Sequence, residues 1–166
     1  GMNQKANIYI EGNAGTGLGE NMMSGTIHVK GNASQSAGAT GHGGTIIVDG
    51  DASSRCGISM KGVDIIVKGS VGHMSAFMAQ AGTLMICGDA GDALGDSIYE
   101  TVIYLAGKPK SLGVDCIEKK ITKNDLKKIE NLLKIGNVKK LKPHNFKKFG
   151  SARKLYNFNI DNVSDY

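Results

Sequence analysis

The sequence predicts an all-β solenoid, a right-handed parallel β-helix with 19-residue coils, followed by a C-terminal helix and an extended basic tail. Two observations predict it. A glycine recurs every 19 residues without slippage, at Gly12, Gly31, Gly50, Gly69, Gly88 and Gly107. Each of these glycines is preceded by two aliphatic residues, one four positions and one two positions earlier. The stretch GNAGTGLGE at 12–20 also returns, four periods later, as GDAGDALGD at 88–96. Fixed periods of this length indicate stacked repeats.

Each repeat begins with a short strand. Aliphatic and other residues alternate before the glycine, which is typical of a strand with one buried face. In a parallel stack, equivalent residues of successive coils lie about 4.8 Å apart, so the aliphatic residues form an interior ladder. A propeller or a sandwich is a poor fit, because both need antiparallel returns. The ladder comprises Ile8, Ile27, Ile46, Ile65, Leu84 and Ile103, with Ile10, Val29, Val48, Val67, Ile86 and Leu105.

Each strand ends at a corner. The residue after the glycine is Asn13, Asn32, Asp51, Ser70, Asp89 or Lys108. Most of these tolerate a left-handed conformation and form turns through side-chain hydrogen bonds. The remaining glycines are expected where the chain bends sharply. GNAGTGLGE is therefore interpreted as a corner and not as a phosphate-binding loop, because it leads into another strand and no Gly-Lys-Ser/Thr triplet occurs.

The repeat fades after Gly107, with an irregular corner at 111–113. Thr122 and Asp125 resemble a capping box that opens an amphipathic helix ending near Gly136. The predicted division is a β-helix over 7–121 and a capping helix with a docking tail over 122–166. We expect the helix to cover the last coil with one apolar face, formed by Leu126, Ile129, Leu132 and Leu133.

Charge divides the chain near the same point. Residues 1–107 hold 5 Lys/Arg against 9 Asp/Glu, whereas 108–166 hold 15 against 6. We expect the tail to lie along an acidic surface, its own or a partner's, and its removal from residue 143 onward to leave the β-helix folded. RNA binding is the less favoured alternative. The tail carries Lys147, Lys148, Arg153 and Lys154 among the aromatics Phe146, Phe149, Tyr156 and Phe158.

No catalytic, cofactor-binding or metal-binding residue is predicted. Gly95-Asp96-Ser97 is similar to the start of GDS-L-type serine esterases, but no Asp-x-x-His follows it. The acidic residues Glu20, Asp92 and Asp96 fall at corners, and His28, His42, His73 and His144 show no metal-ligand spacing. Cys56, Cys87 and Cys116 form no C-x-x-C pair, which suits free thiols in a reducing cytoplasm. No membrane span or signal peptide is expected.

Several repeat units resemble a known family. The units MSGTIHVKGNA, HGGTIIVDGDA and AGTLMICGDAGDALGDSIYE, then AGKPKSLGVDCIEKKIT and FGSARKLYNF, resemble the C-terminal GXGXG β-helix domain of the glutamate synthase large subunit. Among its members, the free-standing domain 3 and the small subunit of N-methylglutamate synthase are the most similar. The β-helix subunit of formylmethanofuran dehydrogenase shares the repeat and is the alternative, and an independent hydrolase is a further one.

The resemblance implies a scaffold and not a catalyst. In that family an amidotransferase and a synthase barrel with FMN and an iron–sulfur cluster perform the chemistry, and the β-helix packs them together. We therefore expect no activity and no cofactor in this chain alone. Its expected partners are the amidotransferase and synthase subunits of a cytoplasmic glutamate-synthase-type oxidoreductase, which makes glutamate. Self-association remains open, and neither membrane nor nucleic acid is an expected partner.

Overall fold

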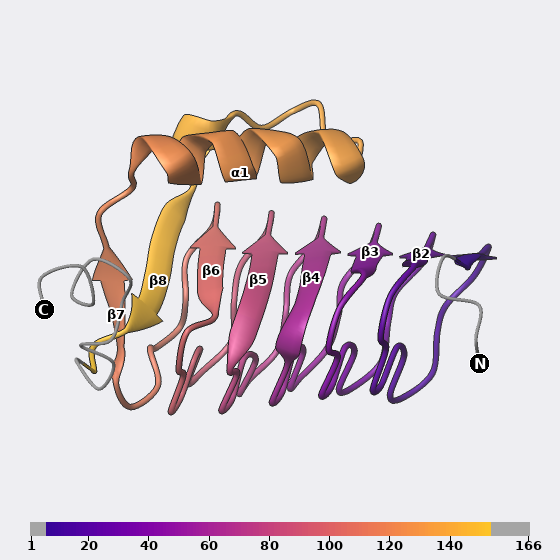
Figure 1. Ribbon diagram of the computed structural model, residues 1–166, viewed down its shortest axis with the longest axis horizontal. Helices are drawn as coiled ribbons and strands as arrows, with labels where there is room; N and C mark the ends of the chain where they lie inside the picture. Colours follow the sequence, from indigo (N-terminus) through magenta and orange to yellow (C-terminus); the bar gives the residue numbers. More distant parts are fainter. Residues whose placement is uncertain (1–5, 154–166) are drawn as a thin grey trace, which may run out of the picture.

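The structure, a computed structural model that describes residues 6–153, is a parallel β-solenoid (Figure 1). Six strands stack in chain order, and each of the first five pairs in parallel with the equivalent strand about 19 residues later, as Ile27 does with Ile46. The predicted fold class and coil length are confirmed. The strands are β1 (Asn7–Ile10), β2 (Thr26–Val29), β3 (Thr45–Val48), β4 (Lys61–Val67), β5 (Ala81–Ile86) and β6 (Val102–Leu105).

The aliphatic ladder fills the interior in the predicted register. Ten of its twelve residues are buried, among them Ile46, Ile65 and Val67, which have no exposed surface. The exceptions lie in the first coil, where Ile8 is 51% exposed and Ile10 is partly buried. The prediction of burial is wrong for Ile8, because among the described residues no coil lies beyond β1 to cover it.

The corner residues connect neighbouring coils instead of closing their own turns. Asn32 Oδ1 accepts a hydrogen bond from the backbone N–H of Asp51 at 2.8 Å, and the same contact recurs from Asn13 to Lys108. None of these residues has a positive φ, so the expected left-handed conformation is wrong here. The periodic glycines leave room for these corner side chains: a Cβ on Gly50 would lie 2.0 Å from Asn32 Oδ1.

Left-handed residues occur instead in the arc that follows the corner. There the chain places non-glycine residues at positive φ at intervals of 19, as at Ser36, Arg55, Met74 and Ala93. Alternate backbone N–H groups donate to opposite neighbours: Arg55 donates to the following coil and Gly57 to the preceding one. The arc therefore carries its own ladder of coil-to-coil hydrogen bonds, which satisfies a backbone that forms no regular strand.

The basic tail is in part a strand, which sequence reasoning missed. After β7 (Cys116–Lys119) and the helix α1 (Lys123–Ile135), a 3-10 turn η1 (Pro143–Asn145) leads into β8 (Lys147–Ser151). Strand β8 lies antiparallel between β6 and β7. Phe146 and Phe149 are buried in the two hydrophobic clusters, so the expectation that residues from 143 onward run over a surface is wrong for this part. Residues 154–166, with Lys154, Tyr156 and Phe158, lie outside the described residues.

The helix begins as predicted but covers a different surface. Thr122 Oγ1 accepts from the Asp125 N–H, and the Asp125 carboxylate accepts from the Thr122 N–H, which completes the capping box. The helix lies along the side of the solenoid (Figure 1), and Leu126, expected to be covered, is exposed. Its buried residues Ile129, Leu132 and Leu133 pack on outward-facing side chains of four strands, namely Ile47, Ile66, Met85 and Tyr104.

Candidate interaction surface

The serine that looks esterase-like serves a corner of the solenoid. Ser97 Oγ donates to Asp96 Oδ1 at 2.9 Å, and Asp96 Oδ2 accepts from the Val114 N–H at 3.1 Å. Asp96 therefore fixes the next coil, and within the described residues neither side chain has a histidine partner. A nucleophilic serine needs such a base. These contacts give the pair a structural role.

The three cysteines are inert thiols. Burial raises the pKa of Cys56 to about 12, and that of Cys87 and of Cys116 to about 11. The thiolate is the nucleophile and metal ligand, and at neutral pH it is scarcely populated at these values. Within residues 6–153, no group of three or more His, Cys, Asp or Glu residues could hold a metal ion. Nor does that part of the chain contain a helix of the length and apolarity that crossing a membrane requires.

The glycine-rich stretch at 12–20 uses its backbone donors within the solenoid. The N–H of Ala14 donates to Asn32 O at 2.8 Å, and the N–H of Gly17 donates to Gln35 O at 2.9 Å. A phosphate-binding loop needs several N–H groups that converge on an empty space. Here they point to the following coil, as expected for a corner.

At the N-terminal end, the outer face of the sheet carries a polar cluster that α1 does not cover. The Tyr9 ring meets His28 edge to face, with centroids 5.2 Å apart. His28 Nε2 and Lys68 Nζ both approach Asp49 Oδ1, at 2.8 Å and 2.9 Å. Burial acts to raise the pKa of Asp49, but the hydrogen bonds from Lys68 and His28 outweigh it and hold the pKa below its usual value. Tyr9 is about half exposed and available to a partner.

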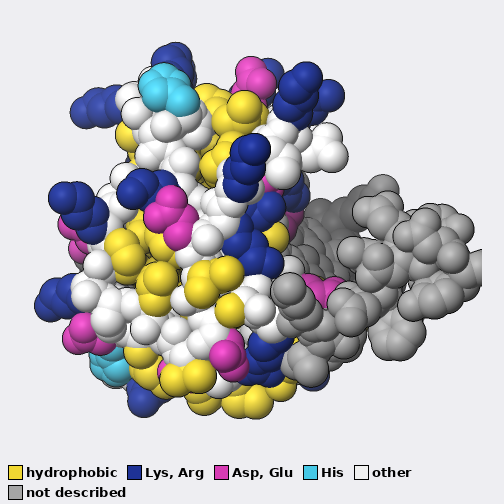
Figure 2. Space-filling view, turned by 90° about the vertical axis from the view of Figure 1, so that its left-hand side faces the viewer, with side chains coloured by type: hydrophobic (Ala, Val, Ile, Leu, Met, Phe, Trp, Pro, Cys, Tyr) yellow, Lys and Arg dark blue, Asp and Glu magenta, His cyan; other side chains and the backbone are white. Residues whose placement is uncertain are grey.

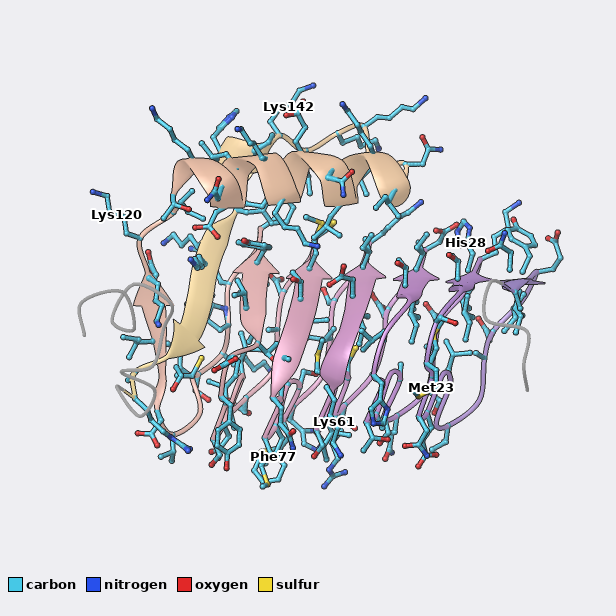
Figure 3. All side chains as sticks on the ribbon, viewed as in Figure 1. Met23, His28, Lys61, Phe77, Lys120 and Lys142 are labelled. Carbon is cyan, nitrogen blue, oxygen red and sulfur yellow. The ribbon has the colours of Figure 1, made fainter. Side chains whose placement is uncertain are left out.

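The layer formed by α1 and the segment that follows presents a basic surface, which we call the lysine face. Residues 119–148 contain eleven lysines and two acidic residues. One acid, Asp125, is buried and pairs with Lys148 at 2.9 Å. Figure 3 places Lys142 beyond the helix, on the side away from the sheet. The exposed members of the lysine face are Lys123, Lys127, Lys134, Lys139, Lys140 and Lys142.

Two further features belong to this surface. A hollow of about 330 Å³ between the end of α1 and the returning segment is lined by Lys134, Lys139 and Lys142, which brings these charges together. The last coil exposes Val114 and Ile117, and Figure 2, a view onto that end, shows hydrophobic side chains below the gathered Lys and Arg side chains. Exposed apolar side chains rimmed by polar and charged ones mark a candidate protein-binding site.

Comparison with known proteins gives one relative and two negative results. Protein GlxC of Rhizobium meliloti (strain 1021) is 60% identical over 166 residues, which are 100% of this chain and 73% of the relative. No family model matches the chain, and no solved structure matches it.

Proposed function

The chain belongs to the family of Protein GlxC, and from that premise we propose that it is a non-catalytic scaffold subunit of a glutamate-synthase-type complex. The resemblance of its repeats to the GXGXG β-helix domain supports the type of complex. Its proposed partners are an amidotransferase subunit and a synthase subunit that holds FMN and an iron–sulfur cluster, in the cytoplasm. The chain itself is proposed to bind no cofactor and to lack activity on its own.

One observation carries the scaffold role. The pair that most resembles a catalytic motif serves the fold: Asp96 accepts from the next coil at Val114, and Ser97 donates to Asp96. The cations of the lysine face, in contrast, mostly have no acidic partner among the described residues. The pair Lys134–Glu130, at 3.9 Å, is the exception among its exposed members. A rigid solenoid with a positively charged side is suited to hold an acidic subunit surface.

Affinity purification tests the proposal. A tagged chain is expected to co-purify from native cells with an amidotransferase and a flavin-containing synthase subunit. The flavin absorbance should belong to the complex and be absent from the lone chain. Co-purification with molybdopterin- or tungsten-containing subunits would instead favour the formylmethanofuran dehydrogenase alternative. Hydrolysis by the lone chain that Ser97→Ala abolishes would contradict the absence of activity.

Charge reversal tests the surface. The double variant Lys127→Glu/Lys139→Glu is expected to weaken association with the synthase subunit at least tenfold at low salt. The difference from wild type should shrink as salt rises, because screening weakens interactions between exposed charges. The double variant Lys30→Glu/Lys61→Glu is the charge-matched control, since both lysines are exposed and lie outside the lysine face. Equal affinity of the two double variants would contradict docking through the lysine face.

A further inference from the structure

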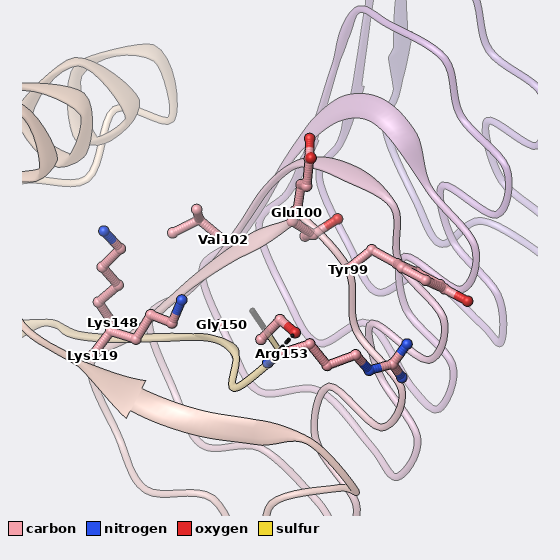
Figure 4. A pocket seen from close by; sticks show the side chains of 9 residues that line it. Tyr99, Glu100, Val102, Lys119, Lys148, Gly150 and Arg153 are labelled. Carbon is pink, nitrogen blue, oxygen red and sulfur yellow. Dashed lines mark hydrogen bonds between the residues drawn. The ribbon is translucent and has the colours of Figure 1, made fainter. Parts of the chain in front are cut away.

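An apolar groove of about 410 Å³ lies where the arcs of two coils lead into β5 and β6. Met78, Ala81 and Tyr99 give it an apolar lining, which the polar residues Gln80 and Glu100 complete. Tyr99 and Glu100 also line a second hollow, which extends to β8 (Figure 4). The groove is therefore continuous with the place where the chain leaves β8, and it lies outside the lysine face.

Met78 is unusual for its position in the coil. The equivalent residues of the other coils, at intervals of 19, are all polar: Asn21, Thr40, Ser59 and Ser97. All five have a positive φ, which is 51° at Met78. A left-handed backbone disfavours a large side chain, and Met78 is still 39% exposed, so the described residues give it little burial in return. An apolar side chain at such a position indicates a further contact.

The described part of the chain ends beside this groove. The guanidinium carbon of Arg153 lies over the Tyr99 ring, 4.9 Å from its centroid, and Figure 4 shows the two side chains next to each other. Arg153 Nε donates to Asp115 Oδ2 at 3.0 Å. The Ala152 N–H donates to the backbone oxygen of Asp115 at 2.8 Å. These contacts hold the chain, as it leaves β8, against the aromatic wall of the groove.

The sequence that comes next, outside the described residues, has the pattern of a half-buried strand. Residues 154–160 read KLYNFNI. Two asparagines separate three apolar residues, which gives an extended segment one apolar side and one polar side. The apolar side comprises Tyr156, Phe158 and Ile160, and the polar side Asn157 and Asn159.

The groove is within reach of this segment. Met78 and Tyr99 belong to neighbouring coils, which are about 4.8 Å apart along the stack. An extended chain advances about 3.3 Å per residue, so Tyr156 and Phe158 lie up to about 10 Å and 17 Å beyond Arg153. Because Arg153 already contacts Tyr99, both aromatic rings can reach Met78.

We infer that residues 154–160 of the same chain lie across this groove, with their aromatic side against Met78. A methionine sulfur packs favourably on aromatic rings, which gives the exposed Met78 its missing contact. Glu100 is exposed and lines the groove, so it offers a counter-charge to Lys154. The inference does not depend on the scaffold proposal, since it concerns contacts within one chain.

The rate of methionine oxidation tests whether the groove is covered. Full-length chains are treated with dilute hydrogen peroxide, and mass spectrometry follows the sulfoxide at each methionine, because exposure governs its formation. The double variant Tyr156→Ser/Phe158→Ser should oxidise at Met78 several-fold faster than wild type. Met23, which is 68% exposed and lies in the first coil, is the internal reference and should oxidise at an unchanged rate.

The polar side of the segment provides the matched control. Asn157→Ser/Asn159→Ser changes as many residues of the segment but leaves its aromatic side, so Met78 should oxidise as slowly as in wild type. Neither double variant should alter the melting temperature appreciably, because ordering a chain end costs conformational entropy that offsets most of what its contacts contribute. A change at Met78 therefore reports on the groove and not on unfolding. Equal rates at Met78 in the two double variants would overturn the inference.

Methyl NMR identifies the occupant. The Met78 methyl resonance, assigned through its loss in Met78→Leu, should lie upfield in wild type, because a nearby aromatic ring shields it. It should move downfield in Tyr156→Ser/Phe158→Ser, at every protein concentration. An upfield position that grows with concentration would assign the groove to the segment of a second copy. One that appears only with a partner subunit present would assign it to that partner. Either result would overturn docking within one chain.

Discussion

Tyr104 and Asp125 join the solenoid to its outer layer through one hydrogen bond. The Tyr104 hydroxyl, on β6, donates to Asp125 Oδ1 at 2.5 Å in a buried setting. The same carboxylate accepts from the Thr122 N–H and from Lys148 Nζ, so it connects β6, the start of α1 and β8. Asp125 thus serves both the capping box and the contact between the sheet and its helix.

Loss of the tyrosine hydroxyl should loosen this junction. Tyr104→Phe is expected to lower the free energy of unfolding by about 2 kcal/mol, the value of a hydrogen bond to a charged group. The ring remains and still packs on α1, so the fold should be kept. Urea denaturation followed by circular dichroism measures the loss. Stability equal to wild type would show that the other donors alone satisfy Asp125.

The same carboxylate makes stability depend on acid pH. Burial acts to raise the pKa of Asp125, but hydrogen bonds from Tyr104, Thr122 and Lys148 outweigh it and lower the pKa to about 2. Because the folded pKa lies below the ordinary value of 3.8, this stabilisation is fully present above about pH 4 and is lost as the pH falls through about 2. Its size is about 2 kcal/mol.

Denaturation of wild type and Asp125→Asn at pH 7, 4 and 2.5 checks this dependence. The stability difference between them should be constant from pH 7 to 4 and should shrink towards pH 2.5. Glu11→Gln is the matched control, because it changes the net charge equally and Glu11 is exposed, away from the network. A difference that persists undiminished at the lowest pH would contradict the assignment.

The corner ladder should contribute to stability at each coil. Asp51→Ala removes the acceptor for the Ser70 N–H, now 2.8 Å from Oδ1, and should cost about 1 kcal/mol. Asp51→Asn keeps an oxygen in place and should cost much less. The melting temperatures of the two variants, beside Glu11→Ala as an exposed control, measure the difference. Equal effects of Ala and Asn at this position would show that the contact contributes nothing.

The interior ladder allows a test of register. Val67→Asp places a carboxylate at a position with no exposed surface and should unfold the domain or nearly so, because a buried unpaired charge costs several kcal/mol. Lys30→Asp, at an exposed outward position, should be tolerated. Lys68, the outward neighbour of Val67, is paired with Asp49 and would not serve as a neutral control. Similar thermal melts for the two variants would contradict the register.

Much of the solenoid could be predicted from sequence because its signals are local and periodic. The alternation before each glycine fixed which residues of β2 to β6 face inward, and Thr122 with Asp125 marked the helix start. The surface that the helix covers also had a signal: the outward position changes from Tyr9 and His28 to Ile47 and Ile66. That second apolar row indicates where an amphipathic helix can pack.

Other features had no local signal. Strand β8 contains Lys147-Lys148-Phe149-Gly150, which lacks the alternation of a half-buried strand, and its place between β6 and β7 depends on partners distant in sequence. Such non-local pairings decide the C-terminal part of the fold, and periodicity carries no information about them.

The placement of β8 leads to a prediction on chain length. A chain that ends at Lys142 loses the pairing of β8 with β6 and β7, together with the buried rings of Phe146 and Phe149. Each buried aromatic contributes about 3–5 kcal/mol, so the pair alone amounts to most of the stability of an ordinary domain. This chain should therefore be unfolded or aggregated, which reverses the expectation drawn from the sequence that removal from residue 143 leaves the β-helix intact.

A chain that ends at Arg153 is the matched control. It keeps every hydrogen bond and buried residue of β8 within the described part of the chain, including the contact between Lys148 and Asp125. Its melting temperature should therefore lie within a few degrees of that of the full chain, a shift that corresponds to about 1 kcal/mol or less. Circular dichroism melts and size-exclusion chromatography of the two shortened chains compare them. A folded, monodisperse chain ending at Lys142 would show that β8 is dispensable, and the edge of β6 would then have to tolerate exposure.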